Sequence, residues 1–140
     1  MKTVVIDGQG GRLGQLIVEA IKKENIDTSV YAVGTNSAAT GAMLKAGAQF
    51  GATGENPVVV ACRDADVIIG PIGILAADSL LGEITPKMAE AVGRSGAVKL
   101  LLPVSHCNNE VIGVKKLTMS ELAKETAERL KELCPQNTAL

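Results

Sequence analysis

The residues best suited to chemistry form a glycine-rich stretch near the start of the chain: Gly8, Gln9, Gly10, Gly11, Arg12, Leu13 and Gly14. A short apolar run precedes this stretch, and an amphipathic segment follows it. A glycine-rich turn between a strand and a helix lets backbone amides approach an anion, and the helix adds the positive end of its dipole. The stretch therefore predicts a phosphate-binding loop for a nucleotide, unless its glycines only make tight turns.

Two later clusters of turn-forming residues also follow predicted strands, and we expect them to face the same ligand. In open α/β sheets, ligands bind beyond the carboxyl ends of the strands, where such loops meet. The alternative for the first cluster is that it only caps the next helix. The predicted cofactor-binding residues are those of the glycine-rich stretch together with Thr35, Asn36, Ser37, Gly70, Pro71, Ile72 and Gly73.

The residues around this site bear on the cofactor. Dinucleotide folds usually place an acid after the second strand to accept a ribose 2′-hydroxyl, and Thr35 to Ser37 supply none. The neutral donors at residues 35–37, together with Arg12 on the opposite side of the expected site, favour a 2′-phosphate. We therefore expect NAD or NADP, with a slight preference for NADP. Asp7 would repel a pyrophosphate unless it accepts loop amides, and this capping role is favoured over binding a metal or a ligand hydroxyl.

A second polar cluster, at residues 105–109, follows another predicted strand. His106 could act as an acid or base and Cys107 as a nucleophile. Neighbouring residues on an extended backbone point in opposite directions, so the pair has poor geometry for a dyad. These two residues are the candidates for catalysis, but no complete catalytic set and no metal site can be assembled. Asp78, Ser79 and Glu83 are further polar groups that could line a pocket, although capping and surface roles are commoner.

The hydrophobic pattern predicts the elements that would position these residues. Strands are expected at 3–6, 29–33, 66–70 and 98–103, with a brief strand near 49–50 and an edge strand at 111–114. Helices are expected at 12–24, 38–46, 57–65 and 85–94, and from a capping box at Thr118 and Glu121. The segment 57–65 also has strand propensity, but Asn56-Pro57 before it resembles a helix start.

Strands and helices alternate along the whole chain. This alternation predicts an α/β fold: a doubly wound, mainly parallel sheet of about five or six strands with helices on both faces. We expect one Rossmann-like, three-layer domain over residues 1–140. The apolar side chains of the 74–84 segment suggest a homodimer contact, with packing inside the monomer as the alternative: Ile74, Leu75, Leu80, Leu81 and Ile84.

The overall composition excludes some classes of partner. The net charge is -1, tryptophan is absent, and phenylalanine and tyrosine occur once each. Neither nucleic acid nor an anionic membrane surface is an expected partner of such a chain. The three cysteines are widely spaced, which is typical of a reducing compartment. The chain runs directly into its first strand and has no apolar run of about twenty residues, so we expect a cytoplasmic protein.

The stretch from Gly8 to Gly14 resembles the nicotinamide-cofactor loop of dihydrodipicolinate reductases, where G-x-G-G-R-M-G is typical. The likeness covers only this loop and its flanking elements. It implies that the amides of Gly10, Gly11 and Arg12 face a pyrophosphate and that the Arg12 side chain lies over the adenine ribose. A solvated Arg12 is an equal alternative. The second domain and the catalytic motif of those enzymes have no counterpart, so their reaction is not implied.

Over its full length the chain resembles a small bacterial family that carries only a label of unknown function. The segments that carry this likeness are 6–11, 34–37, 43–48, 51–56, 69–73 and 77–86. The resemblance implies a compact Rossmann-like protein and supplies no activity. The sequence therefore predicts a nucleotide-binding module, non-catalytic or regulatory. The alternatives are a small NAD(P)-dependent oxidoreductase completed by a second subunit, and an assembly protein that keeps the fold without a ligand.

Overall fold

The structure is a computed structural model that describes residues 1–104 and 108–135. Its strands and helices alternate as predicted. In chain order they are β1 (Lys2–Asp7), α1 (Arg12–Lys23), β2 (Ser29–Gly34), α2 (Ser37–Ala46), β3 (Phe50–Thr53), α3 (Glu55–Cys62), β4 (Val67–Pro71), the 3-10 helix η1 (Ile72–Leu75), α4 (Pro86–Arg94), β5 (Val98–Leu102) and α5 (Met119–Leu133).

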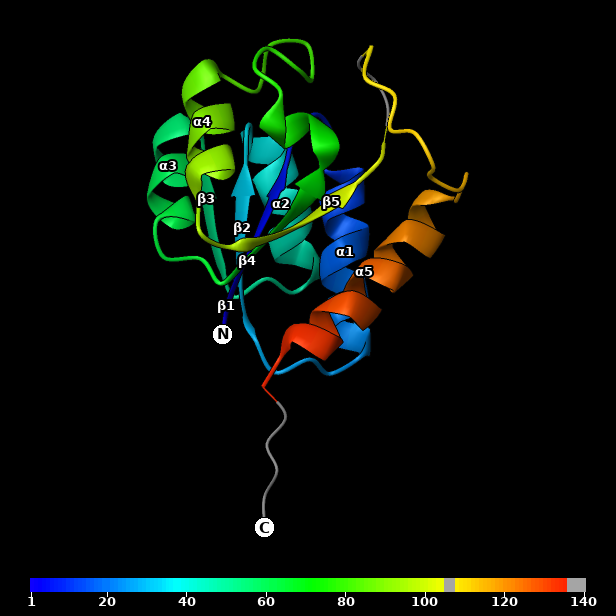
Figure 1. Ribbon diagram of the computed structural model, residues 1–140. Helices are drawn as coiled ribbons and strands as arrows, with labels where there is room; N and C mark the ends of the chain where they lie inside the picture. Colours follow the sequence, from blue (N-terminus) through cyan, green and yellow to red (C-terminus); the bar gives the residue numbers. More distant parts are fainter. Residues whose placement is uncertain (105–107, 136–140) are drawn as a thin grey trace.

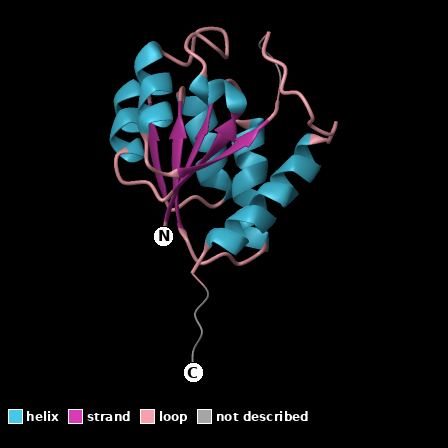
Figure 2. Cartoon of the chain, viewed as in Figure 1, coloured by secondary structure: helices cyan, strands magenta, loops and turns pink. Residues whose placement is uncertain are grey.

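The five strands form one parallel sheet in the order β3-β2-β1-β4-β5. The predicted doubly wound α/β fold is therefore confirmed. Because every strand runs the same way, all their carboxyl ends lie at one edge of the sheet (Figure 2). The central strand β1 is buried on both faces, which explains its continuous apolar run of Val4, Val5 and Ile6.

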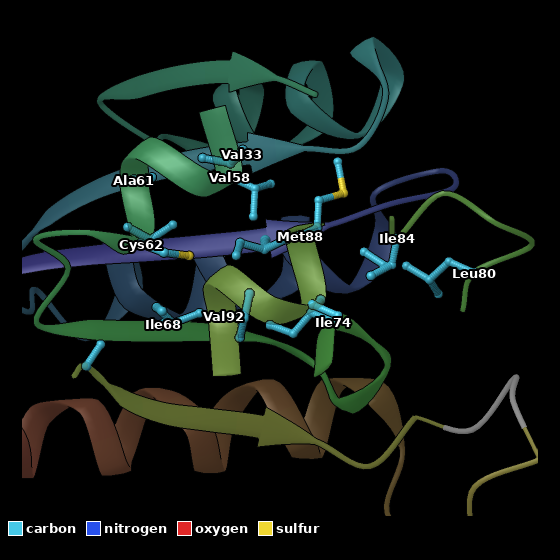
Figure 3. Packing of buried hydrophobic residues seen from close by; sticks show 14 residues of the cluster. Val33, Val58, Ala61, Cys62, Ile68, Ile74, Leu80, Ile84, Met88 and Val92 are labelled. Carbon is cyan, nitrogen blue, oxygen red and sulfur yellow. The ribbon is translucent and has the colours of Figure 1, made fainter. Parts of the chain in front are cut away.

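Helices cover both faces of the sheet (Figure 1). On one face, α1, α2 and α5 pack over Val5 and Ile69, with Ile17 of α1 and Met43 of α2 fully buried. On the other face, α3 and α4 pack over Val4, Ile6 and Ile68. Figure 3 shows this second cluster, in which Val58 of α3 and Met88 and Val92 of α4 meet the sheet. The alternation along β1 thus assigns its side chains to two separate cores.

The starts of two helices follow the predicted caps. Thr118 accepts the Glu121 amide at 3.2 Å, and the Glu121 carboxylate accepts the Thr118 amide at 2.9 Å. This is the predicted capping box of α5. Thr85 caps α4, which begins with Pro86. The ambiguous segment before β4 is a helix, as Asn56-Pro57 predicts. It begins two residues earlier than expected, after the N-cap Gly54, because proline is tolerated within the first turn.

Two strand predictions need correction. The segment 111–114 is irregular, with Gly113 at a φ of +86°, so no edge strand forms there in the described structure. Its valine and isoleucine side chains are exposed, and no neighbouring strand offers them a partner. The brief strand near 49–50 lies slightly later, as β3, where it pairs with β2. Among residues 1–104 and 108–135, none of the helices has the length and apolar character that spanning a bilayer requires.

Candidate functional site

The glycine loop, residues 8–14, joins β1 to α1 at the carboxyl edge of the sheet. Gly11 has a left-handed backbone with a φ of +75°, and its N–H donates to the Gly8 carbonyl at 2.9 Å. A Cβ atom on Gly11 would lie 2.6 Å from the Ala39 Cα atom of α2. Gly11 therefore needs both its unusual backbone and the absence of a side chain.

The other glycines of the loop differ in what surrounds them. A Cβ atom on Gly8 would lie 2.6 Å from Thr35 Oγ1, and one on Gly14 would lie 2.5 Å from Met43 Sδ. These two glycines allow the loop to approach β2 and α2. A Cβ atom on Gly10 would meet nothing within 4 Å. Gly10 is thus the glycine of the loop whose backbone borders open space.

Asp7 caps its own loop, as the sequence favoured. Its carboxylate is buried and accepts the amides of Gly8 at 2.8 Å and Gly14 at 2.7 Å. It therefore supplies the side-chain cap that Gly11, the N-cap of α1, does not have. Burial raises the pKa of Asp7, the two amides oppose this rise, and the nearby charge of Glu83 adds to it.

Glu83 contributes a second carboxylate to the site. Its Oε2 atom accepts the Gln9 amide at 2.8 Å, and its Oε1 atom accepts the Asn36 side-chain amide at 2.6 Å. The same Asn36 nitrogen also donates to the Gln9 carbonyl at 2.9 Å. The carboxylate thus connects the glycine loop to the residue that follows β2. The sequence names Glu83 only as one of three possible pocket groups, because its partners lie 74 and 47 residues away.

The segment that carries Glu83 has a strained backbone. Asp78, Leu80 and Leu81 have positive φ angles of 66°, 54° and 56°, and each such residue costs about 1–3 kcal/mol. The segment keeps this shape because Leu80 and Ile84 pack in the core and the Asp78 amide donates to the Ile84 carbonyl at 2.7 Å. It arches over the carboxyl ends of the strands (Figure 1), which brings Glu83 to the glycine loop.

A cleft of about 230 Å³ lies beside the glycine loop; its lining residues are Asp7, Gly8, Gln9, Gly10, Gly11, Arg12, Leu13, Pro71, Leu80, Val104 and Met119. It opens where β1 and β4 end, which is the point where the strand order reverses direction and α/β folds bind their ligands. The amides of Gly10, Arg12 and Leu13 have no acceptor among the described residues. These three N–H groups can therefore serve an anion in the cleft.

A larger hollow of 530 Å³ lies elsewhere, along the side of β5 and beneath α5. Its walls include Lys99, Glu125 and Arg129, so charges of both signs face it. This hollow follows β5 to its end and reaches the start of α5, but no residue of the glycine loop lines it. We therefore place the candidate ligand site at the smaller cleft, where the backbone donors gather.

Of the predicted cofactor residues at 70–73, one lines the cleft and three do not. Pro71 lines the cleft, whereas Ile72 and Gly73 belong to η1 and do not line it. Gly70 lies inside β4, where a Cβ atom would come within 2.5 Å of the Ile6 carbonyl, so its role is strand packing. The structure thus brings the glycine loop together with only one residue of the 70–73 segment.

The residues after β2 do not line the cleft, but Asn36 is hydrogen-bonded to the glycine loop that does. Asn36 accepts the Ala39 amide at 2.9 Å and so caps α2, which was the structural alternative. Its amide nitrogen is also the donor that reaches Gln9 and Glu83. Thr35 Oγ1 is buried and has no hydrogen-bond partner among the described residues, whereas Ser37 is exposed at the start of α2.

The candidates for catalysis, His106 and Cys107, lie outside the described residues. Within the described part, no group of three acidic, histidine or cysteine side chains is placed to hold a metal ion.

The apolar residues proposed for a dimer contact pack mainly inside the monomer. Ile74, Leu80 and Ile84 belong to the core beneath α4 (Figure 3). Leu75 is 38% exposed and Leu81 is 97% exposed, so one large apolar side chain of this segment projects fully into solvent. The homodimer stays a prediction that the packing within one chain does not test.

The comparisons with known proteins include a family model and a solved structure. The sequence model described as "Domain of unknown function (DUF3842)" matches residues 2–135. None of the curated proteins matches the chain. A crystal structure of a dodecameric FMN-dependent UbiX-like decarboxylase from Escherichia coli O157:H7 is similar at 15% identity, with a TM-score of 0.46 and coverage of 100% of this chain and 98% of that one.

The expectation of NAD or NADP is corrected here: neither the family model nor the solved structure, which is described as FMN-dependent, supports a nicotinamide cofactor. The structure also removes the argument for NADP. That argument depended on the absence of an acid beside the end of β2, and the Glu83 carboxylate lies there, where it would repel a 2′-phosphate. With a TM-score of 0.46, the likeness carries no argument for FMN in its place.

Proposed function

The chain belongs to the family described as "Domain of unknown function (DUF3842)", and we propose that it is a binding module for a small phosphate-bearing ligand of mononucleotide size. The observation that carries this proposal is the group of three amide donors, at Gly10, Arg12 and Leu13, beside the cleft at the end of β1. Backbone donors at the start of a helix are a suitable site for a phosphate.

The size and charge of the cleft limit the ligand. Small-molecule pockets typically enclose about 300–1,000 Å³, and this cleft offers about 230 Å³. It therefore suits a phosphate group with part of a nucleotide, and the rest of such a ligand would extend beyond the cleft. The exposed Arg12 borders the same space and offers a positive charge. Asp7 is compatible with a phosphate because its carboxylate accepts loop amides inside the turn.

A titration followed by ¹⁵N–¹H NMR tests the proposal directly. Inorganic phosphate, FMN, ATP and the ribonucleoside 5′-monophosphates would each be added to the full chain. We expect the amide signals of Gly10, Arg12 and Leu13 to shift the most, and a ligand at a hundred times its dissociation constant to stabilise the fold by about 2.7 kcal/mol. Shifts confined to the hollow at β5, or no response to any ligand, would contradict the proposal; complete silence favours an assembly role.

A charge-matched pair of variants separates Arg12 from the loop amides. Arg12→Ala should weaken binding without abolishing it, because the backbone donors remain. Arg63→Ala removes the same charge from an exposed residue at the end of α3, far along the chain from the loop, and should leave binding unchanged. Equal losses in the two variants would indicate a general charge effect rather than a contact of Arg12 with the ligand.

A further inference from the structure

Glu83 holds a position that the glycine loop and β2 share. Its two carboxylate oxygens accept one donor each, the Gln9 amide at 2.8 Å and the Asn36 side chain at 2.6 Å. A carboxylate has about four lone-pair sites, so each oxygen can accept one more donor. Glu83 therefore offers two free acceptor sites, one on each oxygen of a carboxylate that its hydrogen bonds hold in place. The residue is half-buried and does not line the cleft, so only a ligand that extends beyond the cleft would reach it.

The place of this carboxylate in the fold has a known chemical use. In dinucleotide-binding α/β folds, an acid that follows the second strand accepts a ribose hydroxyl, beside the loop that binds the phosphate. Here the residues that follow β2 are uncharged, but Asn36 holds the carboxylate of Glu83 at that point. The acid therefore comes from the segment between η1 and α4 instead of from the end of β2.

We propose that Glu83 is the ribose acceptor of the site, and that the ligand is a 5′-phosphorylated ribonucleoside with a free cis-diol. This inference rests on the proposed function, since it needs the phosphate at the glycine loop. The two free acceptor sites of Glu83 match the two hydroxyl donors of a ribose diol. A ribose that carries a 2′-phosphate would meet the negative charges of Glu83 and Asp7 and is disfavoured.

The segment around Glu83 is built to hold the carboxylate in place. Leu80 and Ile84 flank it and are buried in the core, and its backbone is closed by the hydrogen bond from Asp78 to Ile84. The strained φ angles of Asp78, Leu80 and Leu81 are kept only because this packing determines them. A carboxylate fixed in this way loses little freedom when it binds a hydroxyl pair, which favours selective recognition.

Calorimetric titration of the full chain tests the inference. The ligands are the four ribonucleoside 5′-monophosphates and their 2′,3′-dideoxy counterparts. We expect the wild-type protein to bind the best ribonucleotide about tenfold more tightly than its dideoxy form, because a hydrogen bond to a charged group contributes a free energy of about that size. In Glu83→Gln this ratio should fall towards one, while the dideoxy form binds as before. Glu128→Gln, which changes an exposed glutamate on α5, should keep the wild-type ratio.

The outcomes separate this inference from the proposed function. If ribonucleotides and dideoxynucleotides bind equally well to the wild type, the diol contact is refuted and the phosphate site stands. A preference that persists in Glu83→Gln also refutes it. If no nucleotide binds, the proposed function fails and this inference with it. Circular dichroism of Glu83→Gln checks the fold, and shifts of the Gln9 amide signal in the wild type provide a readout that is independent of the variant.

Discussion

The left-handed conformation of Gly11 leads to a quantitative prediction for Gly11→Ala. The new methyl group would lie 2.6 Å from the Ala39 Cα atom and 3.0 Å from the Ala39 carbonyl oxygen. Both are backbone atoms of α2, so they cannot rotate away as the end of a flexible side chain can. The φ angle of +75° adds a second penalty, because a Cβ atom is unfavourable in that region.

The size of the effect follows from these two terms. A left-handed non-glycine residue costs roughly 1–2 kcal/mol, and forcing extra volume into a packed interface costs about 1–3 kcal/mol. Alanine also lowers the conformational entropy of the unfolded chain, which offsets about 0.4–1 kcal/mol of this destabilisation. We expect Gly11→Ala to lower the free energy of unfolding by about 2–4 kcal/mol. For a chain of 140 residues this corresponds to a fall in Tm of roughly 8–16 °C.

Urea denaturation followed by far-ultraviolet circular dichroism is the suitable assay, since the chain has no tryptophan and a single tyrosine. Gly10→Ala is the matched control: it makes the same change one residue earlier, at a glycine without a positive φ and with open space around it. Its stability should stay within about 0.5 kcal/mol of the wild type. The reasoning is refuted if Gly11→Ala is as stable as the wild type, or if Gly10→Ala is destabilised equally.

Three further predictions concern other parts of the chain. Gly41→Ala should stabilise the protein by about 0.5–1 kcal/mol, because Gly41 lies exposed within α2 with nothing within 4 Å of a new Cβ atom; an unchanged Tm would contradict this. Burial raises the pKa of the Cys62 thiol to about 11, so Cys62 should react with iodoacetamide at pH 8 at least about a hundredfold more slowly in the folded than in the urea-unfolded chain, as peptide mass spectrometry can measure. Burial also raises the pKa of Asp7 above its ordinary value of 3.8, so the folded state takes up this proton before the unfolded state does. Lowering the pH from 7 towards 4 should therefore stabilise the wild type relative to Asp7→Asn in urea denaturation, and a difference that stays constant over this range would argue against a raised pKa.

Local patterns were sufficient for most of the secondary structure. The apolar run of β1, the stripe of α1 and the caps at Thr85 and Thr118 each depend on residues within a few positions of one another. Steric and hydrogen-bonding preferences between residues this close in sequence do not depend on the rest of the fold, so they predict local structure directly. The errors arose where a short segment lacked a partner: residues 111–114 have strand propensity, but no strand of the described sheet lies beside them.

The preference for NADP failed for a different reason. It treated the end of β2 as a site made only from the residues that follow β2, and found no acid there. The structure brings Glu83 to that place from a segment 47 residues after Asn36. Buried neighbours hold this segment in position despite its strained φ angles, and neither feature leaves a recognisable signal in the sequence.

The sequence by itself determined the sheet, the glycine loop and the cap that Asp7 provides, because these follow from the periodicity and chemistry of neighbouring residues. Only the tertiary structure decided which polar groups share the site. It separated Ile72 and Gly73 from the cleft, and it joined Gln9, Asn36 and Glu83 in one hydrogen-bonded group. Contacts between distant segments depend on how the whole core packs, and a pattern read along the chain carries little information about that packing.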